Sequence, residues 1–469
     1  MTSGPEPGQV SGRPRLVVVG GGIAGLATAY AAARDGSREV LLLEAIDRVG
    51  GKLRLAEVAG VPVDVGAEAM LNRRPEGVDL ARAVGLEVVH PAVAESNVWA
   101  AGGLHRLPRT LMGVPLDPDA LGGFGPLRAD DVARIRAEPD LPASVVEGDV
   151  SVGELVEERF GRAVVDLLVE PLLGGVYAGH ADLISARAAL PQLVDYATRG
   201  SVLEHAASIP TTYDAPVFAG IPGGMGLLPD AVVAAGGFEV RTGAVVRELA
   251  RADGRFRLTV GSAADPETVT ADQVVLATPA APTARLLADL APEAARELAA
   301  VESASVAVVT FAFSAAQVDE LPGSGFLVPP SEGRAIKAST FSFAKWAWTR
   351  AAGVGRGPSG ADLLFLRTSL GRHREEATLQ VPDEELVRVS LAELAEAVGL
   401  RATPVDVHVQ RWGGGLPQYA LGHLDRIARV RESVASVPGL AVCGAAYDGV
   451  GIPAVIGSAE RALAGLGER

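Results

Sequence analysis

Three glycines and one acid near the start of the chain have a spacing that could do chemistry. Gly20, Gly22 and Gly25 fit the pattern G-x-G-x-x-G, directly after an apolar run at residues 16–19. In such a pattern the first glycine makes a tight turn, the second lets the main chain approach a diphosphate, and the third lets a helix pack on a strand. Glu44 lies 24 residues after Gly20, where a carboxylate can accept hydrogen bonds from a ribose. The spacing predicts an adenosine dinucleotide site.

These residues need a strand, a helix and a second strand to position them, and the sequence predicts these at 16–19, 23–34 and 39–43. Ile23 and Ala24 would then lie at the helix N-terminus, where free N–H groups and the helix dipole favour a phosphate. Residues 16–33 carry no charge and also fit a crude transmembrane template. A membrane span leaves the glycines and the spaced acid unexplained, so we expect no integral membrane segment.

The segment after the second strand distinguishes between a nicotinamide and a flavin dinucleotide. It reads E-A-I-D-R-V-G-G-K at 44–52 and contains Ala45, Arg48, Gly51 and Lys52. This run resembles the extended signature of FAD-containing amine oxidases and their relatives, in which the arginine and the paired glycines close over the diphosphate. The alternative is a glycine-rich surface turn, which the two halves of the motif together disfavour.

The composition excludes several classes of protein. With 469 residues, 48% of them hydrophobic and 21% charged, the chain is typical of a soluble globular protein with two or three lobes. Its net charge of −15 argues against a nucleic-acid partner. Cys443 is the only cysteine, and the histidines show no metal-ligand spacing. We therefore expect no disulfide, no metal and a cytoplasmic location.

The order of strand and helix patterns predicts an α/β plus α+β fold class with three parts. A discontinuous Rossmann-like FAD-binding domain would comprise residues 13–72, 216–298 and 436–469. A mixed β-sheet substrate domain would comprise 73–116 and 299–435, and a helical lobe 117–215. The last buried strand, at 440–444, leads to a helix expected from residue 455.

From about residue 13 onward, the chain resembles the FAD-dependent protoporphyrinogen/coproporphyrinogen oxidases of haem biosynthesis. Besides the N-terminal motif, the resemblance is carried most specifically by E-P-L-L-G-G-V-Y-A-G at 170–179 and G-A-A-Y-D-G-V-G-I-P at 444–453. Less specific matches lie at 325–329, 341–346 and 411–423. The resemblance implies an amine-oxidase-like flavoprotein that binds FAD non-covalently.

The same resemblance implies a reaction and partners. A flavin would take hydrides from a porphyrinogen, in three reductions for six electrons, and oxygen would reoxidise it with release of hydrogen peroxide. The arginine- and alanine-rich composition suggests a GC-rich, actinobacterial genome, for which the family habit is coproporphyrinogen III oxidation. A ferrochelatase acting downstream is a further expected partner. The helical lobe binds the membrane in some relatives, whereas the charges here predict at most a peripheral contact.

The resemblance also assigns roles to individual residues. Gly444, Gly451, Ile452 and Pro453 would lie near the flavin, where N–H groups can stabilise charge on the reduced ring. The other expected cofactor ligands are Gly66, Ala67, Glu68 and Val246 or its neighbour Val245. Basic partners for the propionates would be Arg74, with Arg187 and Lys345 as weaker candidates, and Tyr177 could border the macrocycle.

Several alternatives stay open at this point. The substrate could be protoporphyrinogen IX, or the chain could be an amine oxidase or carotenoid desaturase of the same fold. A non-catalytic FAD-binding protein is a third possibility, which the complete set of motifs disfavours. Exposed or core positions are the alternatives for Arg74 and Tyr177, and no residue stands out by motif as a catalytic base.

Overall fold

A computed structural model describes residues 12–34, 36–209 and 216–467 of the chain. Its first unit is a five-stranded parallel sheet with the strand order β11-β2-β1-β15-β21. The strands come from the start, middle and end of the chain, namely β1 (Arg15–Val19), β2 (Glu39–Leu43), β11 (Glu239–Arg241), β15 (Gln273–Leu276) and β21 (Leu440–Val442). The apolar run at 16–19 forms the central strand because both faces of this sheet are covered.

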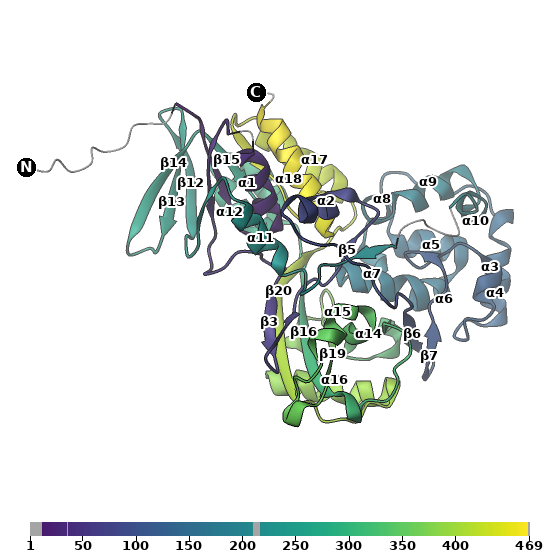
Figure 1. Cartoon of the computed structure of the whole chain (residues 1–469). Helices are drawn as coiled ribbons and strands as arrows, with labels where there is room; N and C mark the ends of the chain where they lie inside the picture. Colours follow the sequence, from purple (N-terminus) through teal and green to yellow (C-terminus); the bar gives the residue numbers. More distant parts are fainter. Residues whose placement is uncertain (1–11, 35, 210–215, 468–469) are drawn as a thin grey trace, which may run out of the picture.

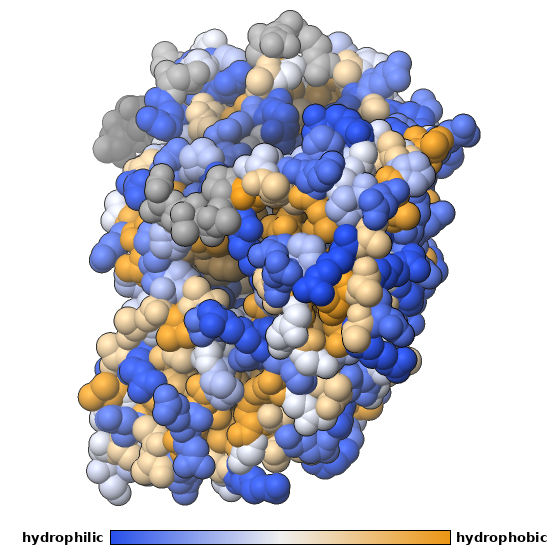
Figure 2. Space-filling view, turned by 90° about the vertical axis from the view of Figure 1, so that its right-hand side faces the viewer, coloured by the Kyte–Doolittle hydropathy of each residue, from blue (hydrophilic) through white to orange (hydrophobic). Residues whose placement is uncertain are grey.

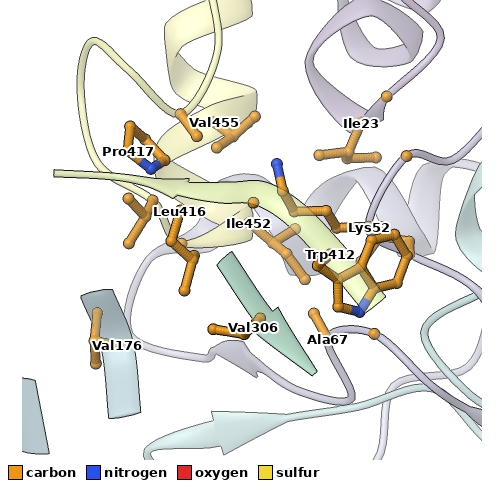
Figure 3. Close-up of a pocket in the computed structure, with 18 of the residues that line it drawn as sticks. Ile23, Lys52, Ala67, Val176, Val306, Trp412, Leu416, Pro417, Ile452 and Val455 are labelled. Carbon is orange, nitrogen blue, oxygen red and sulfur yellow. The ribbon is translucent and has the colours of Figure 1, made fainter. Parts of the chain in front are cut away.

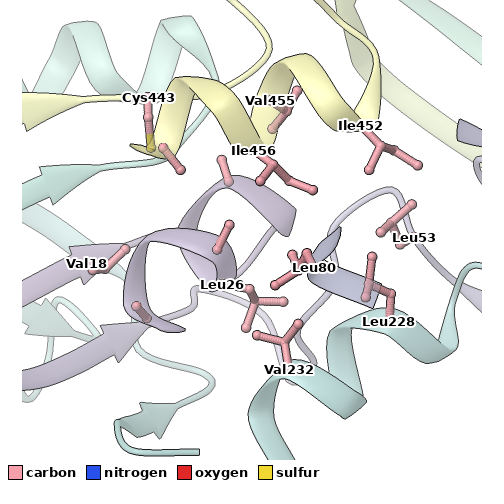
Figure 4. Packing of buried hydrophobic residues seen from close by; sticks show 14 of the residues in the cluster. Val18, Leu26, Leu53, Leu80, Leu228, Val232, Cys443, Ile452, Val455 and Ile456 are labelled. Atoms are coloured by element: carbon pink, nitrogen blue, oxygen red, sulfur yellow. The ribbon is translucent and has the colours of Figure 1, made fainter. Parts of the chain in front are cut away.

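Helices α1 (Ile23–Ala33) and α18 (Ile452–Gly467) cover one face of the parallel sheet. Figure 4 shows Leu26 of α1 near Val232 of α11 (Leu227–Ala235), while Ile456 of α18 approaches α1 from the other side. Two further pairs of strands are antiparallel. One is a hairpin of β3 (Leu55–Val58) with β4 (Val61–Asp64), and the other joins β5 (Met70–Leu71) to the distant β10 (Phe218–Ala219).

The opposite face carries an antiparallel sheet of β12 (Val246–Ala252), β13 (Arg255–Gly261) and β14 (Pro266–Ala271). Three helices complete this second core, α12 (Ala280–Leu287), α13 (Pro292–Ala299) and α17 (His423–Ala435). The cores on the two faces fix the carboxyl ends of the parallel strands, where α/β sheets bind their ligands.

A separate seven-stranded mixed sheet lies below the parallel sheet in Figure 1. Its order is β20 (Asp406–Pro417), β16 (Ser303–Ser314), β19 (Leu363–Leu370), β18 (Ile336–Thr340), β17 (Gly325–Leu327), β6 (Asn97–Ala100) and β7 (Gly103–Arg106). Helix α16 (Asp383–Val398) packs on one face through Leu386 and Leu394, and α14 (Ser342–Lys345) and α15 (Ala347–Ala352) follow β18 in the chain.

The third part is the helical lobe on the right of Figure 1. It contains α3 (Pro118–Leu121), α4 (Ala129–Arg136), α5 (Val152–Phe160), α6 (Arg162–Val164), α7 (Glu170–Tyr177), α8 (Ala186–Ala189), α9 (Pro191–Arg199) and α10 (Val202–Ala206), next to a small hairpin of β8 (Thr110–Leu111) and β9 (Val114–Pro115). Figure 2 looks at the molecule from the side on which this lobe lies, and it shows hydrophilic side chains with hydrophobic ones interspersed. The lobe packs around its own apolar core.

The predicted fold class is confirmed, and three details differ from expectation. Helix α18 begins at Ile452, three residues before the predicted start, because Pro453 is accommodated in its first turn. Helices α2 (Pro75–Ala83) and α17 fall within the bounds predicted for the substrate domain, but their apolar faces pack into the cores of the parallel sheet. The uncharged run at 16–33 is divided between β1 and α1. None of the helices in the described ranges combines the length and apolar character that crossing a bilayer requires.

Candidate functional site

One cavity of about 1320 Å³ connects the parallel sheet with the seven-stranded sheet and the helical lobe. At one end it is lined by the glycine loop after β1 and by the end of β2. At the other end it is lined by apolar residues of β16, β17 and α7, namely Val306, Val308, Phe326, Leu327, Leu172 and Val176. Its volume exceeds the roughly 300–1,000 Å³ of a pocket for one drug-sized ligand. The cavity can therefore hold a large cofactor together with a substrate.

The glycine loop has the geometry of a phosphate cradle. Gly20 has a φ of +110°, and a side chain there would meet the carbonyl oxygen of Ala277 at 2.8 Å. A side chain at Gly25 would lie 1.8 Å from the carbonyl oxygen of Gly20, so this glycine lets α1 pack on β1. Gly22 differs, because its missing side chain would point into open space at the cavity wall. Helix α1 starts there without a side-chain cap, so its free N–H groups are available to an anion.

The second strand brings Glu44 and Ala45 to the same cavity wall. The Glu44 carboxylate accepts hydrogen bonds from the N–H groups of Gly21 and Ile46, at 2.6 and 3.0 Å. Arg48 lies off the wall, and its guanidinium donates to the carbonyls of Val49 and Gly51 at 3.1 and 3.0 Å. Arg48 therefore shapes the loop that presents Gly51, instead of lining the cavity itself.

The segment 444–453 forms the wall between β21 and α18. Gly444 and Gly451 line the cavity, and a side chain at either position would meet nothing within 4 Å. Ile452 also lines the cavity, whereas Pro453 is not among the lining residues and lies behind it near Gly77. Tyr419 fixes this turn, because its hydroxyl donates to the carbonyl of Ala445 at 2.6 Å and accepts from the N–H of Gly449 at 2.7 Å.

Lys52 extends into the cavity between these two glycine-rich segments. Figure 3 shows its amino group among Ile23, Ile452 and Val455, with the Trp412 ring beside the side chain. Burial lowers the pKa of Lys52. A cation at the N-termini of α1 and α18 adds to their dipoles, so this end of the cavity favours an anionic ligand.

Gly66 and Ala67 also line the cavity, and Glu68 stands directly behind them. The Glu68 carboxylate lies 2.9 Å from the Lys345 ammonium and 3.2 Å from the Arg367 guanidinium. Burial alone would raise the pKa of Glu68, but Arg367 and Lys345 hold it at about 2. Both basic side chains line the cavity and share this one carboxylate, so the three groups together keep one positive charge.

The adenine contact expected near Val246 has matching geometry, because Val245 and Val246 both line the cavity at the start of β12. Cys443 is fully buried under α18, and burial raises the pKa of its thiol to about 12. It is not among the lining residues, so it is not placed to bond to a cofactor there.

The structure places three of the predicted substrate residues away from this cavity wall. Tyr177 is buried in the core of the lobe with its ring centroid 5.5 Å from that of Tyr419, while its neighbour Val176 lines the cavity. Arg187 is exposed on α8. Arg74 precedes α2 and pairs with Glu76 at 3.1 Å, three residues after Leu71, which pairs with the cavity residue Phe218. These positions do not support direct roles for Tyr177 and Arg187, and Arg74 stays a prediction.

Lys337, Arg367 and Trp412 are among the wall residues that sequence reasoning did not assign to the site. Trp412 lies in a motif of the resemblance, so the signal for it was present. Lys337 and Arg367 stand on β18 and β19 with no motif around them. Their position depends on strand register, which the sequence alone does not specify.

Comparisons with known proteins agree with this geometry. The chain matches the family described as flavin containing amine oxidoreductase over residues 23–464. Coproporphyrinogen III oxidase of Mycobacterium tuberculosis is 36% identical over 95% of this chain and 96% of that protein. The Bacillus subtilis protein of the same name is 30% identical over 96% and 97%.

Solved structures show the same architecture. A crystal structure from Exiguobacterium has a TM-score of 0.84 and 32% identity, and the match covers 98% of this chain and 100% of that one. Putrescine oxidase, at 18% identity and a TM-score of 0.68, with a match that covers 97% of this chain and 99% of that one, shares the fold. The open cradle at Gly22, Gly444 and Gly451 fits the family's cofactor, so the prediction of FAD is confirmed. The chain belongs to the flavin-containing amine oxidoreductase family, in its branch of FAD-dependent protoporphyrinogen and coproporphyrinogen oxidases.

Proposed function

We infer that the chain oxidises a porphyrinogen, coproporphyrinogen III to coproporphyrin III, with oxygen as electron acceptor in haem biosynthesis. The observation that carries this proposal is one continuous cavity that joins the dinucleotide cradle to an apolar chamber. This chamber is the end of the cavity lined by β16, β17 and α7, with basic side chains of β18 and β19 on its wall. Coproporphyrinogen is a large apolar ring with four carboxylates, which matches that combination of walls. The names of the relatives from Mycobacterium and Bacillus support the same substrate.

The chemistry that FAD supplies when bound is hydride acceptance and transfer of the electrons to oxygen, so three cycles convert one porphyrinogen to porphyrin with three hydrogen peroxide released. The chain itself holds FAD non-covalently through Gly22, Gly51 and Gly444. The apolar side chains of β16 and α7 exclude water and orient the macrocycle against the cradle. Histidine is absent from the described residues that line the cavity, so hydride loss proceeds without an imidazole base there.

An amine substrate is the second candidate, because the fold is shared with amine oxidases. A free carboxylate at the wall would stabilise an ammonium substrate most directly. The acids among the lining residues are Glu44, at the nucleotide end, and Glu95, which is paired with Arg106 at 2.6 Å. Lys337, Lys345 and Arg367 line the chamber instead, and their charge favours carboxylates over amines.

The experiment that tests the function is the growth of porphyrin fluorescence in air, with purified holoenzyme given coproporphyrinogen III and protoporphyrinogen IX in parallel. We expect faster appearance of coproporphyrin, with three hydrogen peroxide per porphyrin in a coupled peroxidase assay. A preference for protoporphyrinogen IX would mean that the chain is a protoporphyrinogen oxidase. Rates equal to those without enzyme for both would overturn the proposal and make amines the next substrates to test.

A further inference from the structure

The lysines of this chain are Lys52, Lys337 and Lys345, and arginine supplies all the other basic residues among the 42. All of these lysines line the cavity of about 1320 Å³. Lys52 stands at the nucleotide end and Lys345 is paired with Glu68 at 2.9 Å. Lys337 lies on β18 and lines the chamber.

Lys337 stands at a β-bulge. In the ladder between β18 and β19, Ile336 pairs with Leu370 and Ala338 pairs with Ser369, so Lys337 is one extra residue without a partner on β19. A bulge re-aims the side chain of the inserted residue. Ile336 packs into the apolar core on the α16 side of the sheet, whereas Lys337 lines the cavity.

Lys337 has no counter-ion in the part of the chain that the structure describes. Its ammonium donates to the carbonyl of Gly174 on α7 at 3.3 Å, and it takes part in none of the ion pairs formed within 4 Å. The charged groups that face it are Arg372 and Arg367, which are basic as well. Arg372 is itself directed to the main-chain carbonyls of Val328 and Arg334.

Without a ligand, the buried ammonium of Lys337 is energetically unfavourable. Lys337 is 5% exposed, and burial, followed by repulsion from Arg372 and Arg367, lowers its pKa to about 7. An unpaired buried charge is unfavourable, and a neutral amide could donate to Gly174 equally well. A ligand carboxylate would compensate the charge and raise the pKa of the lysine again.

We propose that the Lys337 ammonium, which lies at the β-bulge on the cavity side of β18 and opposite Gly174 of α7, binds one carboxylate of the porphyrinogen. This inference rests on the proposed function. Lys337 thereby orients the macrocycle between β18 and α7, while Lys345 and Arg367, which both pair with Glu68, shape the same wall. Lys337 is a binding residue for the substrate and takes no part in the hydride step.

The test uses holoenzyme variants of Lys337. Lys337→Met removes the charge and keeps the length, Lys337→Gln keeps a donor for Gly174 without the charge, and Lys337→Arg keeps the charge. Arg388→Met is the control, because it removes one exposed positive charge from α16. The measurements are KM and kcat for coproporphyrinogen III, the Kd for coproporphyrin III from fluorescence quenching, the flavin absorption spectrum and Tm.

We expect Lys337→Met and Lys337→Gln to raise both KM and Kd about tenfold to a hundredfold, the range for losing a hydrogen bond to a charged group. The flavin spectrum and kcat should stay near those of the wild type, Tm should not fall, and Lys337→Arg should recover part of the affinity. Wild-type KM and Kd in Lys337→Gln would overturn the inference, since the lysine would then only tie α7 to β18. Failure of the proposed function would show in the wild type itself, as no porphyrin formed from either substrate.

Discussion

The Glu44 carboxylate accepts a hydrogen bond from the main-chain N–H of Gly21 at 2.6 Å, across the gap between the end of β2 and the glycine loop. The same carboxylate also accepts from the N–H of Ile46 at 3.0 Å. Glu44 therefore fixes the shape of the cradle from within, in addition to the ribose contact that its position predicts. Glu44 should therefore affect FAD binding in two ways, through the shape of the glycine loop and through the ribose contact.

Substitutions at Glu44 should separate these two effects. Glu44→Ala loses both the loop contacts and the ribose acceptor, and we expect FAD retention to weaken by about 1–3 kcal/mol. Glu44→Gln keeps an acceptor oxygen and should lose less. The measurement is the FAD-to-protein ratio after purification and the Kd for FAD on reconstitution. A Glu44→Ala protein that purifies with full FAD would contradict the ribose role.

Lys52 should contribute to FAD binding through its charge. The ammonium points into the cavity at the start of α1 and α18, and it forms no ion pair within the described residues. Lys52→Met should weaken FAD binding about tenfold, as expected for one charge-assisted hydrogen bond. Dissociation of FAD, followed by the rise of its free fluorescence, measures this, with Arg388→Met as the matched loss of one charge. Equal Kd values in the two variants would exclude the contact.

Arg74 tests the prediction made from the resemblance. It pairs with Glu76 at 3.1 Å before α2, close in the chain to the Leu71–Phe218 strand pair. If it reaches a propionate at the rim, Arg74→Ala should raise KM for coproporphyrinogen III, but by less than Lys337→Met, because its side chain is 43% exposed and water screens the charge. FAD content should not change. A wild-type KM would remove Arg74 from the site.

The parts of the site that could be predicted from the sequence are those made by local geometry. The turn at Gly20, the close packing at Gly25 and the acid after β2 all lie within one β-α-β unit, where short-range spacing determines position. FAD and the fold class followed from this unit and from the C-terminal turn. Two residues predicted to bind the cofactor, Arg48 and Pro453, lie behind the cavity wall and do not line it.

The substrate chamber could not be predicted in the same way. Glu68 meets Arg367 only because the segment after β4 lies against β19, which is far along the chain. Lys337 lies on the cavity side of β18 and its neighbour Ile336 on the core side, and a shift of the strand register by one residue would exchange the two faces. Val176 lines the cavity and Tyr177 does not, because successive residues of a helix point in different directions.

The Tyr419 hydroxyl should stabilise the turn after β21. It links the carbonyl of Ala445 and the N–H of Gly449 at 2.6 and 2.7 Å, so Tyr419→Phe leaves both groups without this partner. We expect a loss of about 1–3 kcal/mol in stability and weaker FAD retention, since Gly444 and Gly451 belong to the same turn. Tyr196→Phe in α9 is the control. Unchanged Tm and FAD content would show that the turn is held by the main chain alone.

His423 should make the holoenzyme sensitive to acid. It is fully buried at the start of α17 and stacks on Tyr419, with 4.0 Å between ring centroids. Burial, and next the charge of Arg426, lower its pKa to about 4, against an ordinary value of 6.5. The unfolded chain therefore binds a proton in this range that the folded chain does not, so stability is complete above pH 6.5 and is lost as the pH falls toward 4.

At pH 5 this loss amounts to about 2 kcal/mol for the wild type, from a shift of 1.36 kcal/mol per pKa unit over the interval between pH 6.5 and 5. His423→Phe keeps the aromatic stack on Tyr419 and removes the proton site. Its Tm should therefore fall less than that of the wild type between pH 7.5 and pH 5, measured on FAD-loaded protein. Parallel Tm curves for the two proteins across this range would mean that other groups cause the acid sensitivity, because His423 would then bind its proton equally well in the folded and unfolded states.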